Sequence, residues 1–299
     1  MPKKRLAVDL LPAIRKLQVI TKGYAVTGLV GQYTSVFKGK GIEFEDYRLY
    51  SSLDDASLID WKASKKVNRL LIKEYVEERN VNVVFVLDIS ESMLFGSTQK
   101  LKNEYAAELV ASLAHAILEV GDNVGLVMFN DSIVKSILPG RKKSQFYDLS
   151  RSLINADLYG GKIDFSKMSR YVLSSFPRGD VVIIVSDFMG MDKGWRKSLK
   201  FLSGKFDLIG LVIRDPRDRT LPIDYVGEVF IKDPYSNKHL VIDPSLLNEL
   251  YEKEVKIQEE SLLKSFVEAG ADSTLITTDK YFVNPIVKLF KQRSLKMRK

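Results

Sequence analysis

Residues 81–93 read Val-Asn-Val-Val-Phe-Val-Leu-Asp-Ile-Ser-Glu-Ser-Met, and this stretch decides the fold. Residues 81–87 form an apolar run rich in β-branched side chains, which is typical of a central parallel strand covered on both faces. Asp88 follows this run directly. Sheets of this kind bind ligands beyond the carboxyl ends of their strands. The stretch therefore predicts a buried strand and a carboxylate at the ligand-binding edge.

Strands and helices alternate along the rest of the chain. Apolar runs predict strands at 123–129, 132–138, 181–185, 208–213 and 273–277. Helical spacing of apolar residues predicts helices at 100–120, 143–154, 165–176, 195–206, 245–269 and 284–295. This alternation indicates the α/β class, with a doubly wound, mainly parallel, Rossmann-like sheet covered by helices on both faces.

Two regions depart from the alternation. Residues 1–80 carry strand and turn signals and are expected to form a β-rich N-terminal extension. Residues 218–243 are expected to form a β-excursion, in which 227–232 pairs with 239–243. The expected organisation is therefore an N-terminal segment at 1–80, a main domain at 81–295 and the end of a basic tail at 296–299.

The composition limits the possible sites. The chain of 299 residues has no cysteine and two histidines, so any metal must be held mainly by oxygen atoms. No apolar run approaches the roughly 18 residues that cross a bilayer. The basic N-terminus is followed by Asp9 and Pro12, which makes a poor signal peptide. We therefore expect a cytoplasmic protein without a transmembrane segment.

The net charge of +8 is concentrated at the two ends of the chain. Residues 288–299 contribute six basic groups, and Lys3, Lys4 and Arg5 contribute three more, so the rest is close to neutral. A basic tail can contact nucleic acid, an anionic membrane or an acidic partner, or it can simply keep the terminus soluble. A basic stripe with interleaved aromatic residues is missing, so nucleic acid is not the expected partner.

Oxygen-bearing side chains cluster where two predicted strands end. Asp88, Ser90 and Ser92 alternate after the first strand, and Asp187 follows the strand predicted at 181–185. Short oxygen side chains at this spacing can converge on one hard cation, Mg²⁺ or alternatively Mn²⁺ or Ca²⁺. The alternative is a capped helix start, with Ser90 or Ser92 as the N-cap.

The same residues resemble the metal-ion-dependent adhesion site of von Willebrand factor A domains. Asp88, Ser90 and Ser92 match its Asp-x-Ser-x-Ser triad, and Asp187 matches its later aspartate. The resemblance also implies a threonine in a Gly-Gly-Thr-Asp loop. In this chain 159–164 read Tyr-Gly-Gly-Lys-Ile-Asp, so Lys162 or Ile163 takes the place of the threonine. Asp164 matches the acid that follows, and it completes the predicted ligand set.

A longer signature lies before this site. It comprises Gly31-x-Tyr33-x-Ser35, Phe37-Lys38-Gly39-Lys40-Gly41-x-Glu43-Phe44, Arg48, Asp54-Asp55, Ile59-Asp60-Trp61-Lys62-Ala63-Ser64 and Leu71-x-Lys73-Glu74. These residues resemble the domain of unknown function 58 family (DUF58), in which such a segment leads into a von Willebrand factor A-like domain. Members of that family are commonly paired with MoxR-type AAA+ ATPases and are thought to act as adaptors in protein-complex maturation or metal insertion. The resemblance implies the same kind of partner here.

The favoured function is therefore a non-enzymatic, protein-binding adaptor. A cation held by one direct carboxylate keeps positive charge and an open coordination position, which an acidic side chain of the partner can fill. One alternative is a metal-free interaction scaffold on the same fold, and another is a metal-dependent hydrolase or phosphatase that uses Asp88. For the N-terminal signature we expect a structural role, an interpretation that an exposed Trp61 would weaken.

Overall fold

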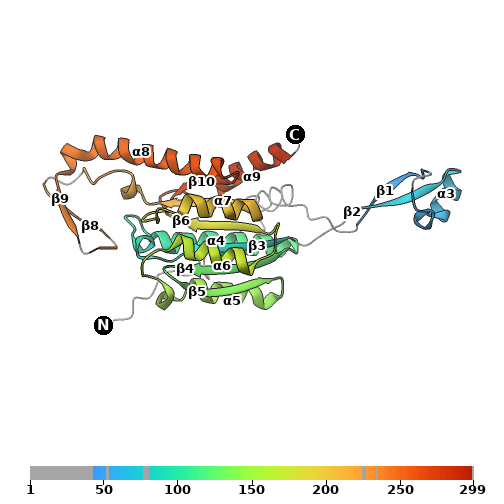
Figure 1. The fold of residues 1–299 in the computed structure, drawn as a ribbon, viewed down its shortest axis with the longest axis horizontal. Helices are drawn as coiled ribbons and strands as arrows, with labels where there is room; N and C mark the ends of the chain where they lie inside the picture. Colours follow the sequence, from blue (N-terminus) through green and yellow to red (C-terminus); the bar gives the residue numbers. More distant parts are fainter. Residues whose placement is uncertain are drawn as a thin grey trace. The chain divides into compact units, whose positions relative to one another are not determined.

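The computed structural model describes residues 43–51, 54–76, 81–223, 227–233, 235–236 and 238–297 (Figure 1). The described residues divide into two compact units, a small one that precedes Asn82 and a larger one that begins at Asn82. The beginning of the N-terminal signature, up to Gly41, lies outside the described residues.

The small unit is a two-stranded antiparallel sheet with helical turns in its long connection. Its elements are β1 (Glu43–Leu49), η1 (Ala56–Leu58), α3 (Trp61–Val67) and β2 (Leu71–Val76). Asp60 caps the N-terminus of α3 by accepting hydrogen bonds from the amides of Lys62 and Ala63, and Asn68, with a φ of 56°, ends the helix. The expectation of strands and turns alone missed α3, because seven residues are too few to show a helical period.

Two features of this unit bear on its expected role. Arg48 binds Asp54 through two hydrogen bonds of 2.7 and 2.8 Å, which fixes the connection after β1. The Trp61 side chain is 68% exposed. An aromatic side chain this exposed is more typical of a contact surface than of a purely structural segment, so the purely structural interpretation is weakened.

The larger unit is built on a six-stranded sheet in the order β10-β7-β6-β3-β4-β5. Its strands are β3 (Asn82–Asp88), β4 (Asn123–Phe129), β5 (Ile133–Gly140), β6 (Val181–Ser186), β7 (Asp207–Arg214) and β10 (Asp272–Thr277). All neighbours are parallel except the edge strand β5, which is antiparallel to β4. The predicted doubly wound, mainly parallel sheet is confirmed.

Helices cover both faces of this sheet (Figure 1). They are α4 (Lys102–Val120), α5 (Lys143–Leu153), α6 (Phe165–Ser175), α7 (Trp195–Lys205), α8 (Pro244–Glu268) and α9 (Val283–Met297). Apolar side chains of α6, α7 and α8 pack with alternate residues of β3, β4 and β6 into one buried core. The described helices agree with the predicted ranges within about two residues, which is the usual uncertainty at helix ends.

The approach of α8 to the sheet depends on one glycine. A Cβ atom added at Gly210 in β7 would lie 2.3 Å from Cε1 of Phe266, which is fully buried in α8. The ring therefore lies directly on the β7 backbone, where any larger residue would displace it.

The β-excursion is confirmed as a hairpin. Strands β8 (Val229–Lys232) and β9 (His239–Ile242) pair antiparallel, with Val229 opposite Ile242 and Lys232 opposite His239. Among the described residues no helix is both long and apolar enough to span a membrane.

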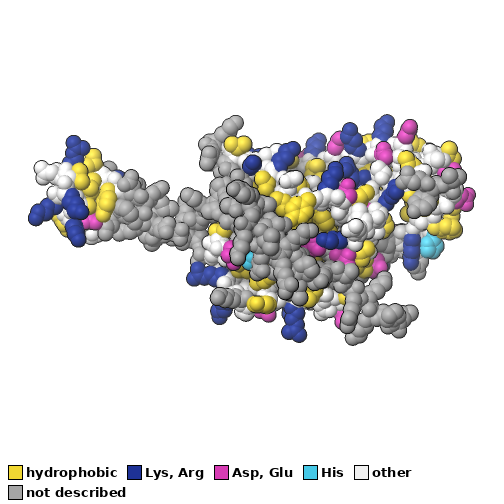
Figure 2. All heavy atoms as spheres, turned by 180° about the vertical axis from the view of Figure 1, so that it is seen from behind, with side chains coloured by type: hydrophobic (Ala, Val, Ile, Leu, Met, Phe, Trp, Pro, Cys, Tyr) yellow, Lys and Arg dark blue, Asp and Glu magenta, His cyan; other side chains and the backbone are white. Residues whose placement is uncertain are grey.

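The basic C-terminal segment lies, as far as Met297, in helix α9 of the folded unit. The Arg293 side chain in α9 is buried and binds Asp207 and Asp272, each at 2.6 Å, and Lys296 also binds Asp272 at 2.6 Å. These pairs neutralise part of the basic cluster. Among the described residues of the larger unit, Figure 2 shows Lys and Arg side chains scattered among acidic ones.

Candidate functional site

The two predicted acidic residues meet at one edge of the sheet. β3 lies directly beside β6, with Leu87 opposite Val185, so both strands carry their next residues to the same edge. The chain runs from β3 to β4 on one side, and it later enters β6 on the other side of β3. This is the topological switch point, where doubly wound sheets place their ligands.

Asp88 is held by neutral hydrogen-bond donors from both strand ends. Its Oδ1 accepts from the Ser90 amide at 2.9 Å, and its Oδ2 accepts from the Ser186 hydroxyl at 2.6 Å. The Asp88 side chain is fully buried. Burial, together with the negative charge of Asp187, raises the pKa of Asp88 to about 7. An ionised Asp88 is therefore an uncompensated buried charge, and binding of a cation would relieve it.

The serines join Asp88 to Asp187. The Ser92 hydroxyl donates to Oδ1 of Asp187 at 3.1 Å, and the hydroxyl oxygens of Ser90 and Ser92 lie 3.4 Å apart. Ser90 begins the short helix η2 (Glu91–Leu94) but makes no side-chain cap hydrogen bond there. The four residues thus converge as predicted, and the capped-helix alternative does not describe Ser90.

Lys102 brings a positive charge to this cluster, which the sequence analysis missed. Its ammonium group lies 2.7 Å from Oδ2 of Asp187 and 2.9 Å from Oδ2 of Asp218, and its side chain is almost completely buried. Burial by itself lowers the pKa of Lys102, but the two carboxylates outweigh burial and raise it above its ordinary value. One ammonium group thus faces two carboxylates, and Asp88 is a third carboxylate in the same cluster.

Lys102 occupies the first turn of α4, which starts at the same sheet edge. Helical side chains tilt toward the helix N-terminus, so Lys102 points back to the strand ends. A cation is unfavourable at this end of a helix, and the carboxylates compensate for it. Lys102 precedes the buried Tyr105 and Ala106 by three and four residues, so it lies on the buried face of the helix.

Tyr235, at the tip of the β8–β9 hairpin, is the second residue that sequence reasoning missed. Its hydroxyl oxygen lies 2.8 Å from the Ser92 hydroxyl and 3.1 Å from the Ser90 hydroxyl. Burial raises the pKa of Tyr235 above its ordinary value, so its phenol is neutral at physiological pH. A third neutral hydroxyl therefore completes a group of three above Asp88.

The predicted Gly-Gly loop lies beside the site through its backbone. The Gly160 amide donates to the Ile89 carbonyl at 2.7 Å, and the Glu91 amide donates to the Gly161 carbonyl at 2.8 Å. Lys162 is exposed, so the buried cation of the site is Lys102 and not Lys162.

Asp164 has a structural task of its own. It is the N-cap of α6, where its carboxylate accepts from the Lys167 amide at 2.7 Å. Its role as a metal ligand stays a prediction, while the cap explains the residue without any ion.

A second layer fixes the backbone around the cluster. Arg214 at the end of β7 donates to the carbonyl oxygen of Asp187, and its guanidinium lies 3.6 Å from Glu259 of α8. Asp215 accepts from the amide of Ser97 at 2.8 Å and from the hydroxyl of Thr278 at 3.1 Å. These buried contacts tie three strand ends to one another and make the edge rigid.

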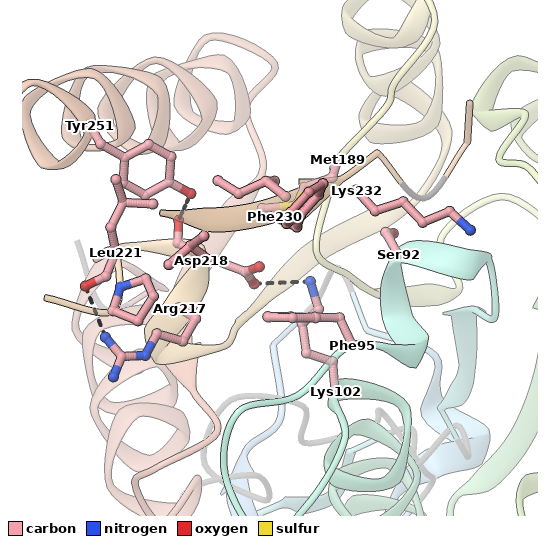
Figure 3. Close-up of a pocket in the computed structure, with 13 residues that line it drawn as sticks. Ser92, Phe95, Lys102, Met189, Arg217, Asp218, Leu221, Phe230, Lys232 and Tyr251 are labelled. Carbon is pink, nitrogen blue, oxygen red and sulfur yellow. Dashed lines mark hydrogen bonds and ion pairs between the residues drawn. The ribbon is translucent and has the colours of Figure 1, made fainter. Parts of the chain in front are cut away.

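A pocket of about 390 Å³ opens beside the cluster, as Figure 3 shows. Ser92, Lys102 and Asp218 form its polar part. The remaining lining is mainly apolar, with Arg217 and Lys232 as further charges, and it comprises Phe95, Met189, Leu221, Pro222, Val229, Phe230, Ile231 and Tyr251. The Tyr251 hydroxyl donates to the Asp218 carbonyl at 3.1 Å and closes one wall.

The donor set fits a hard divalent cation. Carboxylate and hydroxyl oxygens are the ligands that Mg²⁺, Mn²⁺ and Ca²⁺ prefer, and the cluster has more carboxylate charge than Lys102 neutralises. Asp88, Ser90, Ser92 and Asp187 would hold the ion. Among the described residues there is no group of three or more His, Cys, Asp or Glu side chains in metal-binding arrangement, so hydroxyl groups must supply part of the coordination.

The comparisons with known proteins give one family and several distant relatives. The model of the family described as "Protein of unknown function DUF58" matches residues 46–261. The protein "Uncharacterized protein Rv1480" of Mycobacterium tuberculosis is 22% identical over 288 residues, which are 95% of this chain and 90% of that protein.

Solved structures of low identity are similar over most of the chain. The conserved hypothetical protein BatB from Bacteroides thetaiotaomicron is 19% identical, with a TM-score of 0.47 over 73% of this chain and 98% of that chain. The SpRpn10 VWA domain is 13% identical, with a TM-score of 0.41 over 70% of this chain and 94% of that chain. Because both TM-scores are below 0.5, the fold is described from the strand order of this chain and not from these similarities.

Proposed function

The chain belongs to the DUF58 family, and we propose that it is a non-enzymatic adaptor that binds a partner protein through a divalent cation. The observation that carries the proposal is the meeting of Asp88, Ser90, Ser92 and Asp187 at the switch point between β3 and β6. When bound, the ion would supply positive charge and a coordination position for an oxygen atom of the partner.

The role of each residue follows from its contacts. The Asp88 carboxylate would be the main anionic ligand, because its present partners are neutral. Ser90 and Ser92 would act as neutral ligands. Lys102 fixes one oxygen of Asp187, which limits how much negative charge the site directs at the ion. The ion would therefore keep charge with which to attract a carboxylate.

The adjoining pocket supports a partner of defined chemistry. Its apolar wall suits a large apolar side chain, and Ser92 belongs to both the pocket and the cation site. Arg217 and Lys232 add positive charge to its lining. The partner segment would thus carry an aspartate or glutamate next to an apolar residue. The family resemblance points to a MoxR-type AAA+ ATPase, or to its client, as the protein that carries this segment.

The serines are better explained as ligands than as nucleophiles. Their side chains contact carboxylates, Tyr235 and each other, and no histidine is among their described partners. The two histidines lie elsewhere: His115 in α4 packs against Phe146, and His239 in β9 pairs with Lys232. The structure therefore adds nothing to the hydrolase alternative.

Calorimetric titration with Mn²⁺ and Mg²⁺ tests the cation site. Wild type should bind one ion, and Asp88→Ala should abolish binding, because it removes the main anionic ligand. Asp131→Ala, which removes an exposed carboxylate in the turn after β4, is the matched control and should bind like wild type. If the wild type and Asp88→Ala gave the same featureless titration, the metal-free scaffold would replace this proposal.

Co-purification tests the partner. A co-expressed MoxR-type ATPase should stay with the wild-type chain in Mg²⁺ and should be lost in chelator and in Asp88→Ala. Retention that chelator does not change would show a contact independent of the ion. No retention under any condition would exclude that ATPase as the partner.

A further inference from the structure

Three hydroxyl oxygens form a triangle above Asp88. The edges are 2.8 Å from Tyr235 to Ser92, 3.1 Å from Tyr235 to Ser90 and 3.4 Å from Ser90 to Ser92. Two corners come from the loop after β3, and the third comes from a hairpin more than 140 residues further along the chain.

The size of the triangle matches one face of a coordination octahedron. Mg²⁺ binds oxygen at about 2.0–2.1 Å, so that neighbouring ligands lie about 3 Å apart, and the longer bonds of Ca²⁺ give about 3.5 Å. The three edges, from 2.8 to 3.4 Å, are close to these spacings. We infer that Tyr235 is the third hydroxyl ligand of the cation, in the place that the threonine of the adhesion-site motif would take. This inference rests on the proposed function.

Tyr235 is held in position independently of the serines. A Cβ atom at Gly190 would lie only 2.5 Å from Cε2 of the Tyr235 ring, so the ring rests on the backbone that follows Asp187. Asp233 organises the hairpin tip by accepting from the Tyr235 amide at 2.9 Å and from the Ser236 hydroxyl at 2.6 Å. A ligand fixed in this way loses little conformational freedom when the ion binds.

A neutral hydroxyl also suits the charge of the site. Lys162 or Ile163 stands where the motif has its threonine, so the Gly-Gly loop offers no side-chain oxygen at that position. A third carboxylate would add negative charge beyond that of Asp88 and Asp187 and would weaken the attraction of the site for an acidic partner, whereas a phenol adds no charge. Tyr235 thus completes the coordination without reducing the affinity for the partner's carboxylate.

The competing interpretation gives the opposite result. If the Tyr235 hydroxyl only covers the serines in the ion-free protein, it must leave before the ion binds, and its removal would strengthen ion binding. If it is a ligand, its removal weakens binding and admits a water molecule. Tyr235→Phe removes the hydroxyl and keeps the ring on Gly190, so it separates these two cases.

The experiment measures Mn²⁺ affinity by calorimetry and the number of water molecules on bound Tb³⁺ from luminescence lifetimes in H₂O and D₂O. Tyr235→Phe should weaken Mn²⁺ binding roughly 10-fold or more. It should also raise the number of coordinated waters by about one, since water replaces a lost ligand. Tyr147→Phe, which removes the hydroxyl of an exposed tyrosine in α5, is the matched control and should change neither value.

The outcomes separate the two proposals. Unchanged or tighter binding by Tyr235→Phe, with binding abolished in Asp88→Ala, would overturn the role of Tyr235 and leave the cation-dependent adaptor intact. Absence of ion binding in the wild type would overturn both. Thermal unfolding and far-UV circular dichroism of each variant show that the fold is retained.

Discussion

Among the described residues, Lys102 is the one that forms ion pairs with Asp187 and Asp218, and replacing it with methionine removes this positive charge. The ammonium group lies 2.7 and 2.9 Å from the two carboxylates, and the lysine side chain is 1% exposed. Methionine keeps the length and most of the volume of lysine, so the variant tests charge more than packing. It leaves two carboxylates buried together, beside Asp88.

The expected loss of stability follows from these distances. At an effective dielectric constant of about 20, each contact is worth roughly 6 kcal/mol of attraction, most of which the cost of burying the charges offsets. Removal of one partner of a buried pair typically lowers the free energy of unfolding by about 3–5 kcal/mol. This is a large share of the roughly 5–15 kcal/mol that stabilises a domain.

Urea unfolding in chelator measures this loss. The free energy of unfolding of Lys102→Met should be about 3–5 kcal/mol lower than that of wild type. Lys100→Met removes an exposed lysine that is paired with Glu108, and it should change stability by less than about 1 kcal/mol. Mn²⁺ should stabilise Lys102→Met more than wild type, because the ion then meets an additional unpaired carboxylate. A loss below about 1 kcal/mol in Lys102→Met would refute the electrostatic account of this cluster.

Two further predictions follow from the titration of the site and from the packing of the core. Because burial and Asp187 raise the pKa of Asp88 to about 7, lowering the pH from 8 to 6 should weaken Mn²⁺ binding about tenfold, as protons compete for the carboxylate. In chelator the same protonation should stabilise the fold as the pH falls from 7 toward 4, since the pKa of Asp88 in the folded protein lies above its ordinary value of 3.8. If neither the Mn²⁺ affinity from calorimetry nor the free energy of unfolding from urea titration changed with pH, this assignment would be contradicted. Gly210→Ala should lower the free energy of unfolding by about 1–3 kcal/mol, because its methyl group meets Phe266. Gly204→Ala, in α7 with no atom near the added Cβ, should be neutral or stabilising by up to about 1 kcal/mol, and equal effects of the two substitutions would show that Phe266 is not tightly packed there.

The architecture of the larger unit was predictable because each buried strand carries an uninterrupted apolar run. The runs that became β3 and β6 end in Asp88 and in Ser186-Asp187, so their common direction alone brings the two acids to one edge. The hairpin of β8 and β9 was likewise predictable from two short strand patterns around a turn. These are local signals that tertiary contacts did not override.

The residues that complete the site gave weaker signals. Tyr235 reaches the serines only because a hairpin lies over a distant sheet edge, and no local pattern encodes such a contact. Lysine is normally exposed, so Lys102 becomes meaningful only once Asp187 and Asp218 are known to surround it. Asp164 is the opposite case. Its position in the motif matches a ligand of the adhesion site, but its role as the N-cap of α6 also explains the residue.

A crystal structure of the full chain grown with Mn²⁺ tests the central claim most directly. The account predicts one anomalous-scattering peak within bonding distance of the Asp88 carboxylate and the Ser90 and Ser92 hydroxyls. A map without such a peak at saturating Mn²⁺, with Tyr235 still hydrogen-bonded to both serines, would contradict the cation-dependent account. The protein would then be a metal-free binding scaffold.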